Sequence, residues 1–121
     1  MSLVSVSTMQ GAYLKLQVSG SFDSREEIVR CMEALRGEAE RCGCTRAIFD
    51  LTAAQGRTTN MDRFYFGERA AALFRNGLRV AVVFPAAGIT KFGENVAVNR
   101  GAKLAVVPDE TAAIAWLQMP A

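Results

Sequence analysis

The sequence predicts an α/β domain built on one mixed, mainly parallel sheet, and two patterns in the last third of the chain carry this prediction. Residues 79–84 and 104–107 form short runs rich in β-branched apolar side chains. Each run precedes a segment of helical length that has one apolar face. Strands without polar–apolar alternation are typically buried on both faces, as they are in parallel sheets covered by helices.

Composition favours a single ordinary globular domain spanning residues 1–121. A chain of 121 residues with 50% hydrophobic and 21% charged residues can bury one sizeable core. The net charge of +2 is small and the basic residues are scattered, so we expect no nucleic-acid partner. No apolar run approaches the ~20 residues that a membrane span requires, so we expect no membrane span and a cytoplasmic location.

The first half of the chain predicts a hairpin, a helix and a third strand. Residues 3–7 and 12–19 flank Gln10 and Gly11, and apolar and polar residues alternate in the second segment. A helix begins after Ser24, which forms a capping box with Glu27, and ends at Gly43. Residues 45–51 form another buried strand, followed by a polar loop over residues 52–59. The apolar face of the helix contains Ile28, Val29, Cys31, Met32, Leu35, Ala39 and Cys42.

The second half predicts alternating helices and strands. A helix covers residues 60–76 and stops at Gly77, and a strand follows over residues 78–84. The next helix lies between Thr90 and Gly101, residues 102–107 form a strand, and the last helix begins at Asp109. The order β-β-α-β-α-β-α-β-α predicts about five strands and four helices, joined by right-handed crossovers.

This order resembles the STAS domain of anti-anti-sigma factors and of sulfate-transporter tails. In detail it is similar to the STAS/SEC14-like branch of small stand-alone bacterial proteins, over nearly the whole chain. The resemblance implies one α/β domain and no cofactor. It rests on the segments Ile48-Phe49-Asp50-Leu51, Arg63-Phe64, Gly67-Glu68, Val80-Ala81-Val82-Val83, Lys91-Phe92-Gly93-Glu94-Asn95, Asn99-Arg100-Gly101 and Ala115-Trp116-Leu117.

The chain departs from this family at the site of regulation. Anti-anti-sigma factors carry a phosphorylated serine in an Asp-Ser-Ser-Gly turn after a strand that ends in Asp-Leu. Counted from Asp50 and Leu51, that turn falls on Thr-Thr-Asn-Met at residues 58–61. We therefore predict that neither Thr58 nor Thr59 is phosphorylated. Thr59 is instead expected to cap the following helix, with Asp62 at the third helical position.

Catalytic and metal-binding chemistry is largely excluded by residue types. The chain has no histidine, so Ser-His-Asp and Cys-His pairs and histidine metal sites are impossible. Three cysteines are one short of a Cys₄ zinc site, and no glycine-rich phosphate loop occurs. We expect no metal, no cofactor and no enzymatic activity. Cys31 and Cys42 are predicted to be buried core residues, and a redox role for Cys42 and Cys44 is the less favoured alternative.

A candidate partner surface lies on the predicted helix of residues 60–76. Met61, Tyr65 and Ala72 form an apolar strip within its otherwise charged face. Such a strip is typical of a contact with a protein partner or of a homodimer, although single exposed apolar residues are also common. The favoured interpretation is a non-enzymatic regulatory or protein-interaction module that uses this helix and the loop before it.

The alternative function is binding of a small apolar or anionic ligand. In open parallel sheets, ligands bind beyond the carboxyl ends of the strands. Residues 52–59 and 85–90 would roof such a pocket, and a closed cavity would be lined by Phe49, Phe64 and Phe84. The residues of this edge that are candidates for a ligand site or a regulatory loop are Asp50, Arg57, Thr58 and Thr59.

Overall fold

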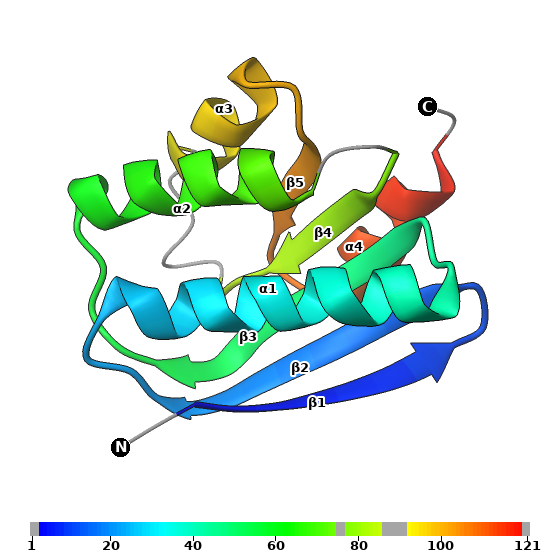
Figure 1. The fold of residues 1–121 in the computed structure, drawn as a ribbon, viewed down its shortest axis with the longest axis horizontal. Coiled ribbons are helices and arrows are strands. Elements are labelled where there is room, and N and C mark those ends of the chain that lie inside the picture. The colour runs from blue at the N-terminus through cyan, green and yellow to red at the C-terminus, as the bar shows by residue number, and fades with distance from the viewer. Residues whose placement is uncertain (1–2, 75–76, 86–91, 120–121) are drawn as a thin grey trace.

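The predicted order of elements is confirmed by a computed structural model, which describes residues 3–74, 77–85 and 92–119 (Figure 1). The described residues form five strands and four helices. No helix in these ranges is both long enough and apolar enough to cross a membrane. The elements are β1 (Leu3–Gln10), β2 (Tyr13–Ser21), α1 (Arg25–Cys42), β3 (Arg46–Gln55), α2 (Asn60–Leu73), β4 (Arg79–Val83), α3 (Phe92–Asn99), β5 (Lys103–Val107) and α4 (Glu110–Gln118).

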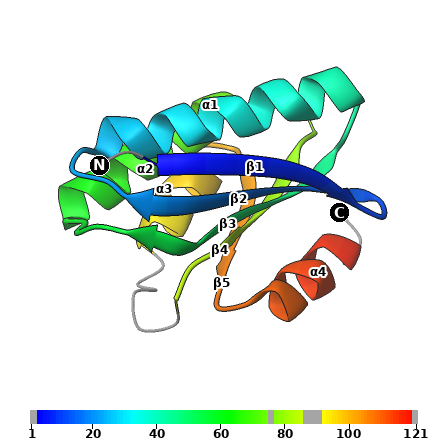
Figure 2. The ribbon, with the colours of Figure 1, turned by 90° about the horizontal axis from the view of Figure 1, so that it is seen from below.

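The strands lie in the sheet in the order in which they occur in the chain. β1 is antiparallel to β2, and β2 to β5 are parallel to one another. Right-handed crossovers that all advance in one direction place their helices on one face of a sheet. Accordingly, α1, α2 and α3 lie on one face and α4 lies on the other (Figure 2).

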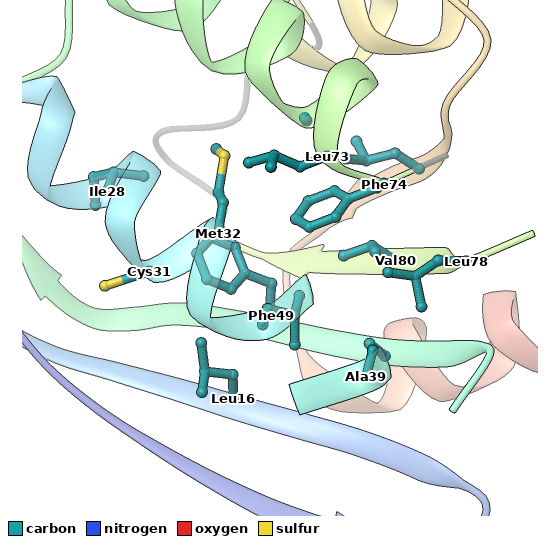
Figure 3. Packing of buried hydrophobic residues seen from close by; sticks show 14 of the residues in the cluster. Leu16, Ile28, Cys31, Met32, Ala39, Phe49, Leu73, Phe74, Leu78 and Val80 are labelled. Atoms are coloured by element: carbon teal, nitrogen blue, oxygen red, sulfur yellow. The ribbon is translucent and has the colours of Figure 1, made fainter. Parts of the chain in front are cut away.

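Two apolar clusters hold these layers together. The larger lies between the sheet and α1–α3, where Met32 of α1, Phe49 of β3 and Phe74, which directly follows α2, converge (Figure 3). The smaller lies under α4 and contains Ile48, Ala81, Val83, Ala113 and Leu117. Adjacent residues of a strand point to opposite faces, so Phe49 belongs to one cluster and Ile48 to the other. β3 is thus buried on both faces, as its lack of alternation predicts.

The predicted ends of α1 are confirmed. The Glu27 carboxylate accepts hydrogen bonds from the backbone N–H groups of Asp23 (2.8 Å) and Ser24 (3.1 Å). These bonds hold the pKa of Glu27 below its ordinary value. At the other end, Gly43 adopts the left-handed conformation (φ 69°), and the N–H of Cys44 donates to the Ala39 carbonyl (2.9 Å).

The prediction that Cys42 is a buried core residue is wrong. Cys31 is buried, and burial raises the pKa of its thiol. Cys42 is exposed because it is the last residue of α1, at the point where the chain turns away through Gly43. It forms a disulfide bond with Cys44. The buried face of α1 therefore ends at Ala39.

Several predicted boundaries also differ. β1 continues to Gln10 and β2 to Ser21, beyond their predicted ends at residues 7 and 19. β3 continues to Gln55 because β2 is long enough to pair with it there, from Ser19 to Ser21. The predicted polar loop is therefore partly strand. α2 ends at Leu73, and the last two residues of its predicted span lie outside the described ranges, as does the predicted cap Thr90.

A buried arginine fixes the end of α4. Arg79, at the start of β4, donates hydrogen bonds to the carbonyls of Trp116 (2.9 Å), Leu117 (3.4 Å) and Met119 (2.6 Å). Its guanidinium also lies over the Trp116 ring, 4.6 Å from the centroid. Trp116 and Leu117 belong to the final turn of α4 and Met119 directly follows it, where carbonyls lack the N–H donor that a continuing helix would supply four residues on. The Met119 N–H also donates to the Trp116 carbonyl (3.2 Å), and Arg79 completes the cap from the sheet.

Candidate functional site

The residues of the predicted partner surface lie on the solvent-facing side of α2. Met61 is 67% exposed, Ala72 is exposed, and Tyr65 is half-buried. The Arg25 guanidinium of α1 lies over the Tyr65 ring at 4.6 Å from the centroid. We call Met61, Tyr65 and Ala72 the α2 strip, and it is continuous with the start of α1 through Arg25.

Charged groups border the α2 strip. Arg25 Nη1 lies 3.8 Å from Asp62 Oδ1, and Arg100 Nη2 lies 3.6 Å from Glu68 Oε2. Ion pairs this exposed contribute little to stability, with a typical value of about 0–1 kcal/mol. Their arrangement around apolar side chains is that of a polar rim around a contact surface.

The predicted capping role of Thr59 is confirmed. The N–H of Asp62 donates to Thr59 Oγ1 (3.1 Å), and the N–H of Thr59 donates to Asp62 Oδ2 (2.9 Å). Arg57 is exposed, whereas Thr58 is half-buried and faces the core between the helices and the sheet. The hydroxyl of Thr59 thus already has a structural function at the start of α2.

Replacing Thr59 by alanine is expected to destabilise the protein by about 1 kcal/mol, because the capping bond to Asp62 is lost. Thr59→Ser keeps the hydroxyl and should retain most of the stability. Urea unfolding measures both variants. Intact-mass analysis of protein from the native host tests the accompanying prediction, and a phosphate mapped to Thr58 or Thr59 would contradict it.

Asp50 does not lie with Arg57, Thr58 and Thr59. Its side chain is on the α4 face, where Oδ1 accepts hydrogen bonds from the Thr52 N–H (2.9 Å) and Oγ1 (2.7 Å). Its Oδ2 lies 3.8 Å from Lys15 Nζ. Lys15 also forms an ion pair with Glu110 at the start of α4. The structure therefore places Asp50 in a charged cluster that joins β2, β3 and α4.

The sequence analysis did not identify Lys15. In the sequence this residue is marked only as one of the polar positions of an alternating strand. The hydrogen bond to Glu110 raises the pKa of the Lys15 ammonium, while partial burial opposes the shift. Because the pKa is raised in the folded state, this pair contributes to stability at neutral pH. The contribution is lost only as the pH rises through the folded-state value.

An apolar cavity of about 120 Å³ lies between α1, α2, α3 and the carboxyl ends of the parallel strands. Its aromatic lining consists of Phe22, Phe49, Phe66, Phe74 and Phe84. Residues with polar side chains are few: Thr58, Arg63 and Glu94. The cavity thus occupies the position at which open parallel sheets bind their ligands.

Phe49 and Phe84 line this cavity as expected, but Phe64 does not. Phe64 is half-buried, and the Arg100 guanidinium lies over its ring at 5.3 Å from the centroid. Phe66, Ala70 and Phe74 face the cavity instead. Their spacing of four residues is the signal that could have identified them, because such residues share one helix face. The loop expected to roof the pocket, at residues 85–90, is described only at Pro85.

Close approach of α2 and α3 forms one wall of the cavity. A Cβ atom on Gly67 would lie 2.7 Å from the Gly93 carbonyl oxygen and 2.7 Å from Val96 Cβ. Only glycine therefore fits at this crossing of the two helices. Gly67 and Gly93 both line the cavity, so this contact also fixes its shape.

Metal binding has no support in the described ranges, which contain no cluster of three or more histidine, cysteine, aspartate or glutamate residues suited to an ion. What the arrangement offers is apolar surface, both inside the cavity and on the α2 strip.

The comparisons with known proteins rest on structure. No protein-family model matches the sequence, and no curated protein is significantly similar to it. An anti-sigma factor antagonist from Mycobacterium paratuberculosis has a similar structure, with a TM-score of 0.65 and 14% identity over 98% of this chain and 96% of that one. The chain has a STAS-like fold.

A second solved structure agrees with this assignment. An uncharacterised protein of the DUF3478 family from Shewanella loihica, described as having a SpoIIAA-like fold, gives a TM-score of 0.53. It is 19% identical over 96% of this chain and 93% of that chain. The predicted STAS-like architecture is therefore confirmed over 96–98% of the chain. At these identities the likeness concerns the fold.

Proposed function

We propose that this STAS-like domain is a non-enzymatic regulatory module that binds a protein partner through the α2 strip and the loop of Arg57, Thr58 and Thr59. The observation that carries the proposal is the exposed apolar side chain of Met61 beside Tyr65, inside a charged border. The similar Mycobacterium protein is an antagonist of an anti-sigma factor, which supports a regulatory role for this fold.

The chemistry of the α2 strip suits a partner contact. Tyrosine and arginine are over-represented among the residues that dominate binding energy at interfaces. The stacking of Arg25 on Tyr65 restricts both side chains before binding, so less conformational entropy is lost when a partner covers them. Exposed ion pairs at the border would then give orientation and specificity more than affinity.

Changing Tyr65 to glutamate is expected to weaken partner binding at least tenfold, because it places a charge at the centre of the apolar contact. Wild-type protein, Tyr65→Glu and the control Val98→Glu serve as baits in the native host's lysate. Val98 is also exposed but lies on α3. Affinity is then measured with the purified partner.

The expected partner is retained by the wild type and by Val98→Glu and is lost with Tyr65→Glu. Circular dichroism must show the same fold in all three proteins. Equal affinity of the wild type and Tyr65→Glu for the recovered protein would contradict the proposal. So would association of the α2 strip with a second copy of this chain in place of a partner.

The cavity supports a second candidate function, the binding of a small apolar ligand. Apolar cavities of about 150 Å³ stay dry and hold a benzene-sized molecule. Pockets for drug-sized ligands are larger, about 300–1,000 Å³. A cavity of about 120 Å³ therefore suits one aromatic ring or a short aliphatic group. Arg63 and Glu94 both line it, and their opposite charges favour a neutral ligand over an anionic one.

Indole or benzene at millimolar concentration is expected to raise the melting temperature of the wild type, because a ligand that binds only the folded state stabilises it. Val82→Phe places a ring in the cavity and should remove the shift. Val98→Phe adds the same ring on the surface, so the ligand should still raise the melting temperature of this variant. No shift in the wild type, or an equal shift in all three proteins, would contradict ligand binding in this cavity.

A further inference from the structure

Exposed apolar side chains concentrate on strand β1. Val4, Val6 and Met9 are 58%, 56% and 52% exposed. The other exposed large hydrophobic residues in the described ranges are Met61, Val98 and Met119, each on a different segment. β1 pairs with β2 on one side and forms the edge of the sheet on the other.

This edge lacks the features that usually prevent strands from pairing. The segment Leu3–Gln10 contains no charged residue and no proline, and its register with β2 runs without a bulge. α1 lies above β1 but leaves space between them. A hollow of about 350 Å³ separates Ser5 and Ser7 from Ala34 and Gly37 of α1. A Cβ added to Gly37 would meet no atom within 4 Å.

The turn between β1 and β2 determines which backbone groups face outward. Gln10 pairs with Tyr13 across the two-residue turn of Gly11 and Ala12. In hairpins with such turns, the pair flanking the turn is hydrogen-bonded, and bonded and non-bonded pairs then alternate. The residues that direct their N–H and C=O groups to the free edge are therefore Leu3, Ser5, Ser7 and Met9.

We propose that β1 pairs with β1 of a second copy of this chain, antiparallel and with Val6 on the two-fold axis. The two sheets then form one continuous sheet across an isologous dimer. In this register the outward-facing groups of the two strands meet. Ser5 lies opposite Ser7 of the second copy, and Leu3 lies opposite Met9 of the second copy. On the other face, Val6 lies opposite Val6 of the second copy.

The self-complementarity of the strand argues for a second copy as the occupant. Serine faces serine, valine faces valine, and the larger apolar residues Leu3 and Met9 face each other. No charges are brought together along β1, and the net charge of each copy is only +2. A two-fold arrangement uses the free β1 edge of both copies, so pairing through β1 stops at the dimer.

Charge substitution at Val6 tests both the surface and the register. Residues opposite each other in a non-hydrogen-bonded antiparallel pair lie about 4.5 Å apart at Cα, so like charges there repel strongly. Wild-type protein is expected to sediment as a dimer. Val6→Lys and Val6→Glu should each weaken self-association at least tenfold. An equimolar mixture of the two variants should restore the dimer.

Met61→Lys is the control, because it adds the same charge on the α2 strip and should leave the dimer unchanged. This also separates the proposal from the proposed function, which concerns that strip. Circular dichroism checks that each variant is folded. Three outcomes would overturn the proposal: a wild-type monomer up to millimolar concentration, a mixture that stays monomeric, or a wild-type monomer whose Val6 variants lose a different protein partner.

Discussion

Replacing Phe49 by alanine is expected to destabilise the protein by about 3–5 kcal/mol. Phe49 is fully buried on the central strand β3 and packs in one cluster with Met32 and Phe74, which lie on the helix side of it (Figure 3). It also borders the apolar cavity, so the space vacated by its ring joins an existing void. Neighbouring side chains then cannot collapse to fill that space, and the cost lies at the upper end of the range.

Urea unfolding measures this effect as a lower midpoint at an unchanged slope. Phe64→Ala is the matched control, because it removes the same ring from a half-buried position beside Arg100. A smaller loss for Phe49→Ala than for Phe64→Ala would contradict the central role of Phe49. Since small domains are stable by about 5–15 kcal/mol, the Phe49 variant would lose a large fraction of the total.

Arg79→Met is expected to destabilise the protein by about 2–4 kcal/mol. The substitution keeps an apolar stem but removes three hydrogen bonds to the last carbonyls of α4. Hydrogen bonds to charged groups contribute about 1.5–3 kcal/mol each, and those bonds share one guanidinium, so their effects do not add. The loss should concentrate in α4.

Hydrogen exchange tests where the effect falls. Amides of α4 should exchange faster in Arg79→Met than in the wild type, relative to amides of α1. Arg79→Lys keeps the charge but lacks the planar guanidinium. Its α4 amides should therefore exchange at rates between those of the wild type and Arg79→Met. Unchanged exchange in α4, with a general loss of stability, would contradict the capping role of Arg79.

Local signals in the sequence proved reliable. The capping boxes at Ser24–Glu27 and Thr59–Asp62 each depend on residues three positions apart, so the sequence contains all that determines them. The buried strand around Phe49 follows from its lack of alternation. The STAS-like architecture then follows from the order of these elements.

Contacts between segments that are distant in the sequence were harder to predict. Lys15, Asp50 and Glu110 come from three elements, and nothing local marks Lys15 as the partner of either carboxylate. In the sequence, Arg79 is only the polar first residue of an apolar strand, and its role becomes visible only from its contact with Trp116 of α4. On α2, apolar residues occupy much of the helix circumference. The sequence alone therefore does not show which of Phe64 and Phe66 faces the cavity, because this depends on where α3 lies.

The order of the strands has a consequence for how the chain is made. Each strand pairs with the one before it, so no strand has to be inserted between two that are already in place. Synthesis delivers the N-terminal segments first, at about 5–20 residues per second. Each crossover can therefore close onto an existing edge soon after it leaves the ribosome. The growing side of the sheet advances from β2 to β5, and α4, which follows β5 in the chain, is the last of these elements to cover the sheet.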